Sequence, residues 1–250
     1  MEFWQVAILA LAGVAAGWIN VMAGGGSLLT VPIMLFLGIP GTIANGTNRV
    51  AILAQNISAV GTFFQRGVSD IRLSLSLAAM ASVGAIVGAN LGLQLDDLWF
   101  NRILAAVMLV VMIIMWSGGF SKKDTAGGGT QPQRLLLGHL LMVGAGFWGG
   151  LMHIGVGLIL MPILHRVLGL NLVLTNMHKV FVVLVYTPIA LWIFAAHLEL
   201  LWWTGLGLGV GNALGGWLGA RTVIAQSEVW IRRVMFTVLS VFIVKLLFFS

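Results

Sequence analysis

Long uncharged hydrophobic stretches alternate with short polar segments along this 250-residue chain. Stretches without Asp, Glu, Lys or Arg include Phe3–Asn48, Leu73–Leu95, Ile103–Ser121, Leu135–His165 and Leu200–Ala220. A helix needs about 20 mostly apolar residues to cross a bilayer, so several of these stretches are long enough for a crossing. The pattern predicts an all-α membrane protein.

Each half of the chain contains four hydrophobic stretches. The first stretch of each half is interrupted by glycine, and a proline follows the interruption within the same stretch. In the first half the stretches are Phe3–Gly38 (interrupted at 24–26), Thr47–Phe64, Leu73–Leu95 and Ile103–Trp116. In the second half they are Leu135–Leu168 (interrupted around 155–157), Val180–His197, Leu201–Ala220 and Val234–Phe249. The segment between the halves, Ser117–Gln133, has the composition of a flexible linker.

The two interrupted stretches repeat one pattern, 130 residues apart. Without a gap, Trp18, Met22, Gly25, Leu28, Pro32 and Ile33 match Trp148, Met152, Gly155, Leu158, Pro162 and Ile163. The chain therefore divides into a first repeat at 1–120, a linker at 121–134 and a second repeat at 135–250. Matched interruptions in two halves of a membrane protein are typical of secondary transporters, whose binding site lies at the interruptions.

The distribution of Lys and Arg predicts how the chain crosses the membrane. The basic loops are 66–72, 122–134, the turn at Arg166 and 221–233. Placing them in the cytoplasm satisfies the positive-inside rule and puts both termini in the periplasm. Each interrupted stretch then enters and leaves on one side, as a re-entrant hairpin that precedes three transmembrane helices, and the two repeats have inverted topology. The alternative is one kinked helix that crosses once per half.

Composition narrows the class further. Hydrophobic residues make up 60% of the chain and charged residues 8%, so a soluble domain could not cover its surface with the polar side chains that are left. The absence of cysteine excludes disulfides and Cys-based metal sites. The net charge of +6 is explained by basic cytoplasmic loops, and we expect no nucleic-acid partner. No signal peptide is evident near the start of the sequence.

The interruptions have the chemistry that an anion site needs. Three successive glycines disfavour a regular helix, and the helix that restarts at Ser27 presents free N–H groups and the positive end of its dipole. Helix N-termini bind anions, and glycine permits close approach of the ligand. We predict that one small anion lies between the two interruptions, near Gly24, Gly25, Gly26, Ser27, His153, Gly155 and Gly157. The alternative is that these glycines serve only helix packing.

A polar strip follows each interruption and contains one cation. The strips are Asn45–Arg49 and Thr175–Lys179, and the 130-residue offset aligns Arg49 with Lys179. A cation within a membrane is costly unless it is paired, hydrated or functional, and an anionic substrate would supply the partner. The predicted binding set therefore also includes Asn45, Thr47, Asn48, Arg49, Asn176, His178 and Lys179. Alternatively, both cations snorkel to the membrane surface.

Two histidines are candidates for proton coupling. His153 lies in the second interruption and His178 beside Lys179, and either could carry a proton, although a lone histidine in a membrane is more often a hydrogen-bonded packing residue. No two of His139, His153 and His165 stand three or four residues apart, so we expect no metal site. The chain also has no hydrolase, kinase or redox motif, and we expect neither an enzyme nor a cofactor.

The run AGGGSLLTVP at Ala23–Pro32, with Gly38–Pro40 and Ala44–Thr47, resembles the sulfite exporter TauE/SafE family. The resemblance covers the whole chain, including its duplication and its central basic loop. It implies a multi-pass transporter of the bacterial inner membrane that moves a small anion such as sulfite or a sulfonate. It does not identify the anion, the direction of transport or the coupling ion. It also leaves the oligomeric state open, and a homodimer is one possibility.

Two other functions also stay open. An anion channel would use the same half-helices but would have no alternating, saturable cycle. A membrane-embedded scaffold or enzyme is disfavoured because the hydrophobic stretches lack catalytic acids and nucleophiles.

Overall fold

The computed structural model describes residues 3–116 and 129–225, which form nine α-helices, one π-helical turn and no β-strand. In chain order these are α1 (Phe3–Ala23), α2 (Ser27–Phe36), α3 (Gly41–Gln65), α4 (Ile71–Gly92), α5 (Asp97–Trp116), α6 (Leu135–Leu151), α7 (Val156–Pro162), the π-helical turn η2 (Ile163–Val167), α8 (Leu172–His197) and α9 (Trp202–Ile224). The all-α class is confirmed. The predicted stretch Val234–Phe249 lies outside the described residues.

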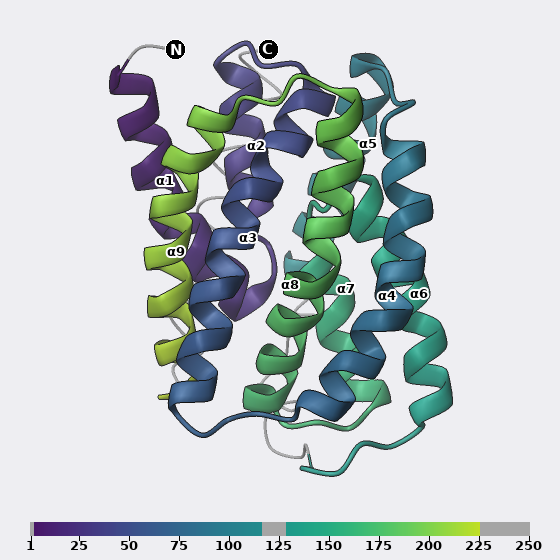
Figure 1. The fold of residues 1–250 in the computed structure, drawn as a ribbon. Coiled ribbons are helices and arrows are strands. Elements are labelled where there is room, and N and C mark those ends of the chain that lie inside the picture. The colour runs from purple at the N-terminus through teal and green to yellow at the C-terminus, as the bar shows by residue number, and fades with distance from the viewer. Residues whose placement is uncertain (1–2, 117–128, 226–250) are drawn as a thin grey trace.

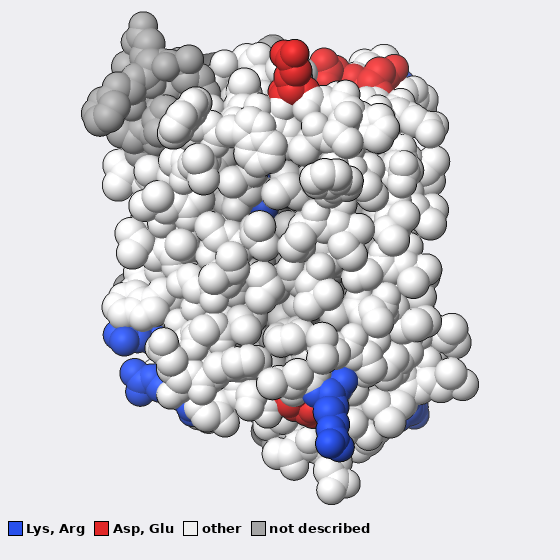
Figure 2. All heavy atoms as spheres, in the orientation of Figure 1, with Lys and Arg blue, Asp and Glu red and all other residues white. Residues whose placement is uncertain are grey.

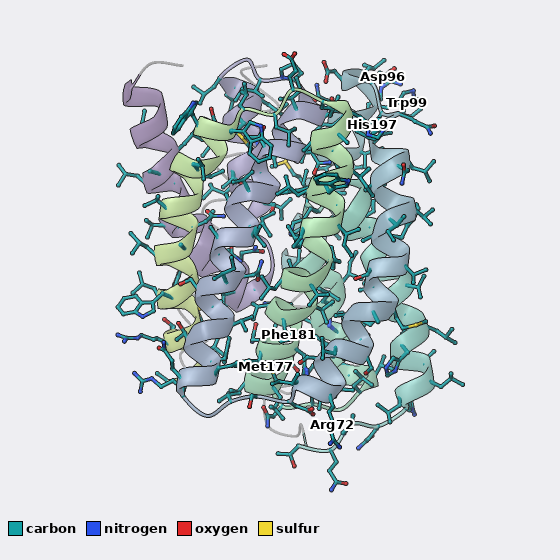
Figure 3. All side chains as sticks on the ribbon, viewed as in Figure 1. Arg72, Asp96, Trp99, Met177, Phe181 and His197 are labelled. Atoms are coloured by element: carbon teal, nitrogen blue, oxygen red, sulfur yellow. The ribbon has the colours of Figure 1, made fainter. Side chains whose placement is uncertain are left out.

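The pairs α1–α2 and α6–α7 turn inside the molecule (Figure 1). Helix α1 begins at the upper end of the view and α6 begins at the lower end. Helix α2 leads back to the upper end, where the Gly41 N–H at the start of α3 donates to Asp97 Oδ1 at 2.9 Å. Helix α7 leads back to the lower end, and α8 then rises past Met177 to His197 at the top (Figure 3). The two turns therefore approach each other from opposite ends.

Helices α3 and α8 begin earlier than the hydrophobic pattern predicts. Helix α3 starts at Gly41, directly after Pro40, and α8 starts at Leu172, where the Asn171 side chain accepts a hydrogen bond from Leu174 N at 2.9 Å. The predicted stretch Thr47–Phe64 begins within the first polar strip, and the predicted stretch Val180–His197 begins directly after the second. The strips in fact lie within the helices, around their second turns, and their polar side chains are buried against other helices.

The second interruption lies about three residues before its expected position. Helix α6 ends at Leu151 and α7 starts at Val156, so the irregular backbone is at 152–155. Two residues here have left-handed backbone, His153 with φ 61° and Gly155 with φ 68°. A left-handed backbone is uncommon at histidine and costs energy unless the surrounding structure stabilises it. Hydropathy does not report backbone conformation, so it gives no sign of this turn.

Glycines spaced four residues apart join the two halves of the chain. They are Gly211, Gly215 and Gly219 on α9, which packs on α1, and Gly84, Gly88 and Gly92 on α4, which packs on α6. A methyl group at Gly215 would collide with Val14 O, and one at Gly88 would collide with Phe147 O. Small residues at this spacing let two membrane helices approach to backbone contact. Each interrupted helix is thus held by a helix from the other half.

The described end of the linker is attached to the turn that follows η2. Gly129 N donates to Gly169 O at 2.7 Å, Asn171 N donates to Gly129 O at 3.0 Å, and Gln133 N donates to Leu168 O at 2.9 Å. Residues 117–128 of the linker lie outside the described part of the chain.

On the face shown in Figure 2, a belt that is almost free of charged groups, with a basic group visible in its middle, lies between two charged ends. Basic groups gather at the lower end, with one acidic group among them, and acidic groups gather at the upper end. Large apolar side chains are exposed on the belt; Trp192 and Leu136, for example, are 77% and 78% exposed. Such a surface is rare on soluble proteins. Among the described helices, α4 and α8 have the length and composition needed to cross a membrane.

Candidate functional site

The two interruptions meet backbone to backbone in the middle of the molecule. Gly24 has a left-handed backbone with φ 81°, and a Cβ added there would collide with the Gly157 backbone and come within 2.8 Å of Leu158 N. A Cβ added at Gly157 would likewise collide with Gly24. No other residue type fits at either position without displacing the opposite turn. The glycines therefore set the closest approach between the two halves.

Both turns satisfy much of their own backbone hydrogen bonding. Leu28 N donates to Gly25 O at 3.0 Å in the first turn, and Leu158 N donates to Gly155 O at 2.9 Å in the second. Gly26 N donates to the side-chain Oδ1 of Asn20 at 3.4 Å. The N–H groups of Gly26, Leu28 and Leu158 are therefore already engaged and are not available to a ligand.

A buried chain of side chains fixes α2 to α3. Thr30 Oγ1 donates to Asn48 Oδ1 at 2.8 Å, and Asn48 Nδ2 donates to Ser27 Oγ at 3.3 Å. The first turn is therefore tied to α3 by side chains as well as by packing. At the 130-residue offset the corresponding residues are Leu160, His178 and Gly157, which cannot form the same chain.

Arg49 caps the end of α6. Its Nη1 donates to Gly149 O at 3.0 Å, its Nη2 donates to Gly150 O, and its guanidinium lies 4.6 Å from the centre of the Phe194 ring. The side chain is fully buried. The last carbonyls of a helix lack helical partners and carry the negative end of its dipole, so a guanidinium is a favourable partner for them.

Lys179 has the same role at the end of α1. Its Nζ donates to Val21 O at 2.6 Å and to Asn176 Oδ1 at 2.6 Å. The side chain is 2% exposed, so neither Lys179 nor Arg49 snorkels to the surface. The matched cations thus cap the interrupted helices crosswise, each one belonging to the half opposite to the helix that it caps.

A small cavity lies beside Lys179 and the second turn. It is lined by Asn20 of α1, Gln55 and Asn56 of α3, His153, Val156 and Gly157 of the second turn, and Lys179, Val180 and Val183 of α8. The centre of a water molecule can occupy about 10 Å³ of it, which is room for about one water. Three helices and the second turn therefore contribute polar groups to one small space. Arg49 is not among the lining residues.

His153 connects the cavity to a buried tyrosine. Its Nδ1 lies 3.2 Å from Tyr186 Oη, whereas its Nε2 is buried without a hydrogen-bond partner among the described residues. An unpartnered ring nitrogen beside a polar cavity is free to bind a ligand or a water molecule. This contact also ties the left-handed turn to α8.

Some other predicted site residues serve to hold helices together. Asn45 Nδ2 donates to Leu151 O at 2.9 Å, beside the carbonyls that Arg49 caps. Thr47 Oγ1 accepts a hydrogen bond from Leu201 N at 3.2 Å. Asn176 is the partner of Lys179, and His178 Nδ1 lies 2.8 Å from Ser74 Oγ of α4. None of Asn45, Thr47 and His178 lines the cavity.

Sequence reasoning missed several cavity residues. Gln55 and Asn56 follow the first polar strip, but nothing in their spacing shows that they face the interruptions. Asn20 stands alone in an apolar helix, and Tyr186 is the only tyrosine of the chain. A single polar residue in a long apolar stretch was the available signal, because such a residue needs a buried partner. Within the described residues, no group of three His, Asp or Glu side chains could hold a metal ion.

Comparison with known proteins gives consistent matches over nearly the whole chain. A sequence model of the family described as "Sulfite exporter TauE/SafE" matches residues 9–246. "Probable membrane transporter protein ORF9" of a Sinorhizobium species is 27% identical over 99% of this chain and 94% of the relative. "Probable membrane transporter protein YfcA" of Escherichia coli K12 is 28% identical over 97% of this chain and 90% of the relative. No solved structure matches the chain.

Proposed function

The chain belongs to the sulfite exporter TauE/SafE family of membrane transporters, and we propose that it carries one small anion across the membrane by alternating access. The proposed substrate is a sulfur-containing anion such as sulfite or a sulfonate, since the family description names sulfite. The proposed binding place is the cavity lined by Gln55, Lys179 and the second turn. We also propose a bacterial inner membrane as the location, because the relatives are probable membrane transporter proteins of bacteria and the described chain is all-α.

The buried Lys179 ammonium in the cavity wall is the observation that carries the proposal. Its two hydrogen-bond partners are neutral oxygens, and no carboxylate among the described residues contacts it. A buried charge without a counter-charge is costly, so an ammonium kept at this place favours an anionic ligand. Gln55, Asn56 and His153 add polar groups around the same space.

The small volume of the cavity supports a cycle with a closed state. Sulfite has four heavy atoms, and space for about one water molecule does not admit it without movement of the turns. The α1–α2 and α6–α7 turns come from opposite ends of the molecule. We propose that they are re-entrant hairpins of inverted repeats, and that movement of one half against the other opens the cavity to each side in turn.

Binding can be tested on the purified protein. A ligand that binds only the folded state at 100 times its dissociation constant raises the unfolding free energy by about 2.7 kcal/mol. We expect sulfite or methanesulfonate to raise the unfolding temperature of the protein in detergent, and choline, a cation, to leave it unchanged. Flux of the stabilising anion into proteoliposomes should saturate with concentration, as a carrier requires and a channel does not. If no small anion stabilises the protein, the proposed function is wrong.

The charges at the two ends predict the orientation in the membrane. Arg72 lies at the lower end and Asp96 at the upper end (Figure 3), and Arg66, Arg134, Arg166 and Arg221 belong to segments at the lower end. The positive-inside rule then places the lower end in the cytoplasm and the start of α1 in the periplasm. A reporter inserted after Gly67 should be active in the cytoplasm. A reporter fused before Phe3 should be active in the periplasm. The reverse pattern would refute this orientation.

A further inference from the structure

One row of hydrogen bonds links the first turn to the cavity and fixes the direction of each amide in it. The backbone N–H of Gly26 donates to Asn20 Oδ1 at 3.4 Å, and Asn20 Nδ2 donates to Gln55 Oε1 at 3.1 Å. A backbone N–H is only ever a donor, so the reverse orientation of Asn20 would place two donors against each other. Asn20 must therefore present its NH2 group to Gln55, and Gln55 must receive it with its oxygen.

The row ends in a free donor at the cavity. Because Gln55 Oε1 is engaged, its Nε2 is the group that remains, and it has no hydrogen-bond partner among the described residues. Gln55 is 1% exposed on the outer surface and lines the cavity, so this N–H group is available only to a molecule in that space. A buried donor without a partner is costly, and a ligand oxygen would satisfy it.

The formal charge around the cavity suits one negative charge. Lys179 is the cation in its wall, and Arg49 is committed to the carbonyls at the end of α6. A charged imidazole at His153 would have no carboxylate beside it among the described residues, so we count it as neutral. Asn56 is neutral and donates one of its two Nδ2 hydrogens to Ile52 O at 2.7 Å, so it adds no charge to the cavity. A second negative charge would therefore lack compensation.

We propose that the cavity binds a monoanion between the Lys179 ammonium and the Gln55 amide N–H, and that Asn20 holds this amide in its donating orientation. The inference rests on the proposed function and specifies the charge class of its substrate. Singly charged oxyanions, such as sulfonates or hydrogen sulfite, fit this arrangement, whereas dianions do not. The arrangement belongs to the first half alone, because the residues at the 130-residue offset from Asn20 and Gln55 are Gly150 and Val185.

Three probes of similar size and different charge test the monoanion inference on the unmodified protein. They are methanesulfonate, which has one negative charge, sulfate, which has two at neutral pH, and dimethyl sulfone, which has none. Calorimetric titration should show the tightest binding for methanesulfonate, binding at least roughly tenfold weaker for sulfate, and none for dimethyl sulfone, since one uncompensated charge outweighs a hydrogen bond. If sulfate binds as tightly as methanesulfonate, the inference fails while anion binding stands. If no anion binds, the proposed function fails and the inference with it.

Variants of the row test the roles of Gln55 and Asn20. Gln55→Met keeps the length of the side chain but removes the donor, and the methanesulfonate affinity should fall by roughly 10- to 150-fold, as expected for a lost hydrogen bond to a charged group. Asn20→Leu should weaken binding in the same direction by releasing the Gln55 amide. The double variant should lose no more than Gln55→Met alone, because both changes remove one contact. Additive losses would refute the positioning role of Asn20.

Gln65→Met is the matched control. Gln65 lies at the end of the same helix and is exposed, so the same chemical change should leave the affinity unchanged. Apo melting temperatures show whether each variant folds. If Gln55→Met folds and binds methanesulfonate like the parent protein, the amide is not a ligand. If it does not fold, the comparison of the three probes on the parent protein decides the inference.

Discussion

Gly24→Ala is expected to destabilise the protein strongly, because Gly24 combines a left-handed backbone with close contact to the opposite main chain. The left-handed backbone of Gly24 disfavours alanine by about 1–2 kcal/mol. The added Cβ would also collide with the Gly157 backbone, and overpacking of this kind costs about 1–3 kcal/mol more. Because the opposing atoms are main chain, no side chain can rotate away to relieve the collision. Denaturant titration in mixed micelles should show a fall of roughly 2–5 kcal/mol in unfolding free energy, together with loss of anion binding.

Two other glycines separate the backbone effect from the collision. Gly38 has nearly the same backbone, with φ 82°, but a Cβ added there would meet nothing within 4 Å. Gly38→Ala should therefore cost only the conformational part, about 1–2 kcal/mol. Gly61 lies within α3, also in open space, and Gly61→Ala should stabilise the protein by up to about 1 kcal/mol. Equal losses for Gly24→Ala and Gly38→Ala would show that the turns do not meet as described.

Arg49→Met should destabilise the protein strongly even though methionine fills much of the same apolar space. The substitution leaves the Gly149 and Gly150 carbonyls without their cap and removes the contact with Phe194. An unsatisfied buried polar group costs about 1–3 kcal/mol, so two of them predict a loss of roughly 2–6 kcal/mol in unfolding free energy. Arg49→Lys should be intermediate, because an ammonium does not offer the planar fork that reaches two neighbouring carbonyls.

The control for Arg49 is an arginine at the surface. Arg66 is exposed in the loop that follows α3, and Arg66→Met should change the unfolding free energy by no more than about 0.5 kcal/mol. An unfolding curve for Arg49→Met like that of the parent protein would refute the capping role. It would favour the sequence-based prediction that Arg49 binds the substrate directly. Loss of stability with anion affinity retained in the remaining folded protein would support the cap.

The sequence was sufficient to predict the helical class, the family and the place where α1 ends, whereas the end of α6 was placed about three residues too late. These predictions rested on the composition and on the matched residues around Trp18 and Trp148. Both can be read directly from the sequence. The pairing of Arg49 with Lys179 across the 130-residue offset was also visible, and the structure adds that each one caps a helix of the other half.

The partners of these residues could not be predicted, because they depend on tertiary packing. No spacing rule connects Lys179 to Val21, or Arg49 to Gly150, more than 100 residues away along the chain. The starts of α3 and α8 were placed too late because hydropathy assigns polar strips to loops, although here the strips are buried. The left-handed conformation of His153 has no sequence signature either, and it moved the second interruption from its expected position.

The packing of α1 on α9 affects how the protein folds while it is being synthesised. Helix α9 begins roughly 180 residues after α1 ends, so α1 leaves the ribosome long before the glycines that receive it exist. At about 5–20 residues per second, the wait is roughly 10–40 s. Helix α6 meets its partner α4 at once, since α4 is made first. Until α9 is made, α1 can pack on α2 and α3, but the face that contacts α9 has to be covered by lipid or by another protein.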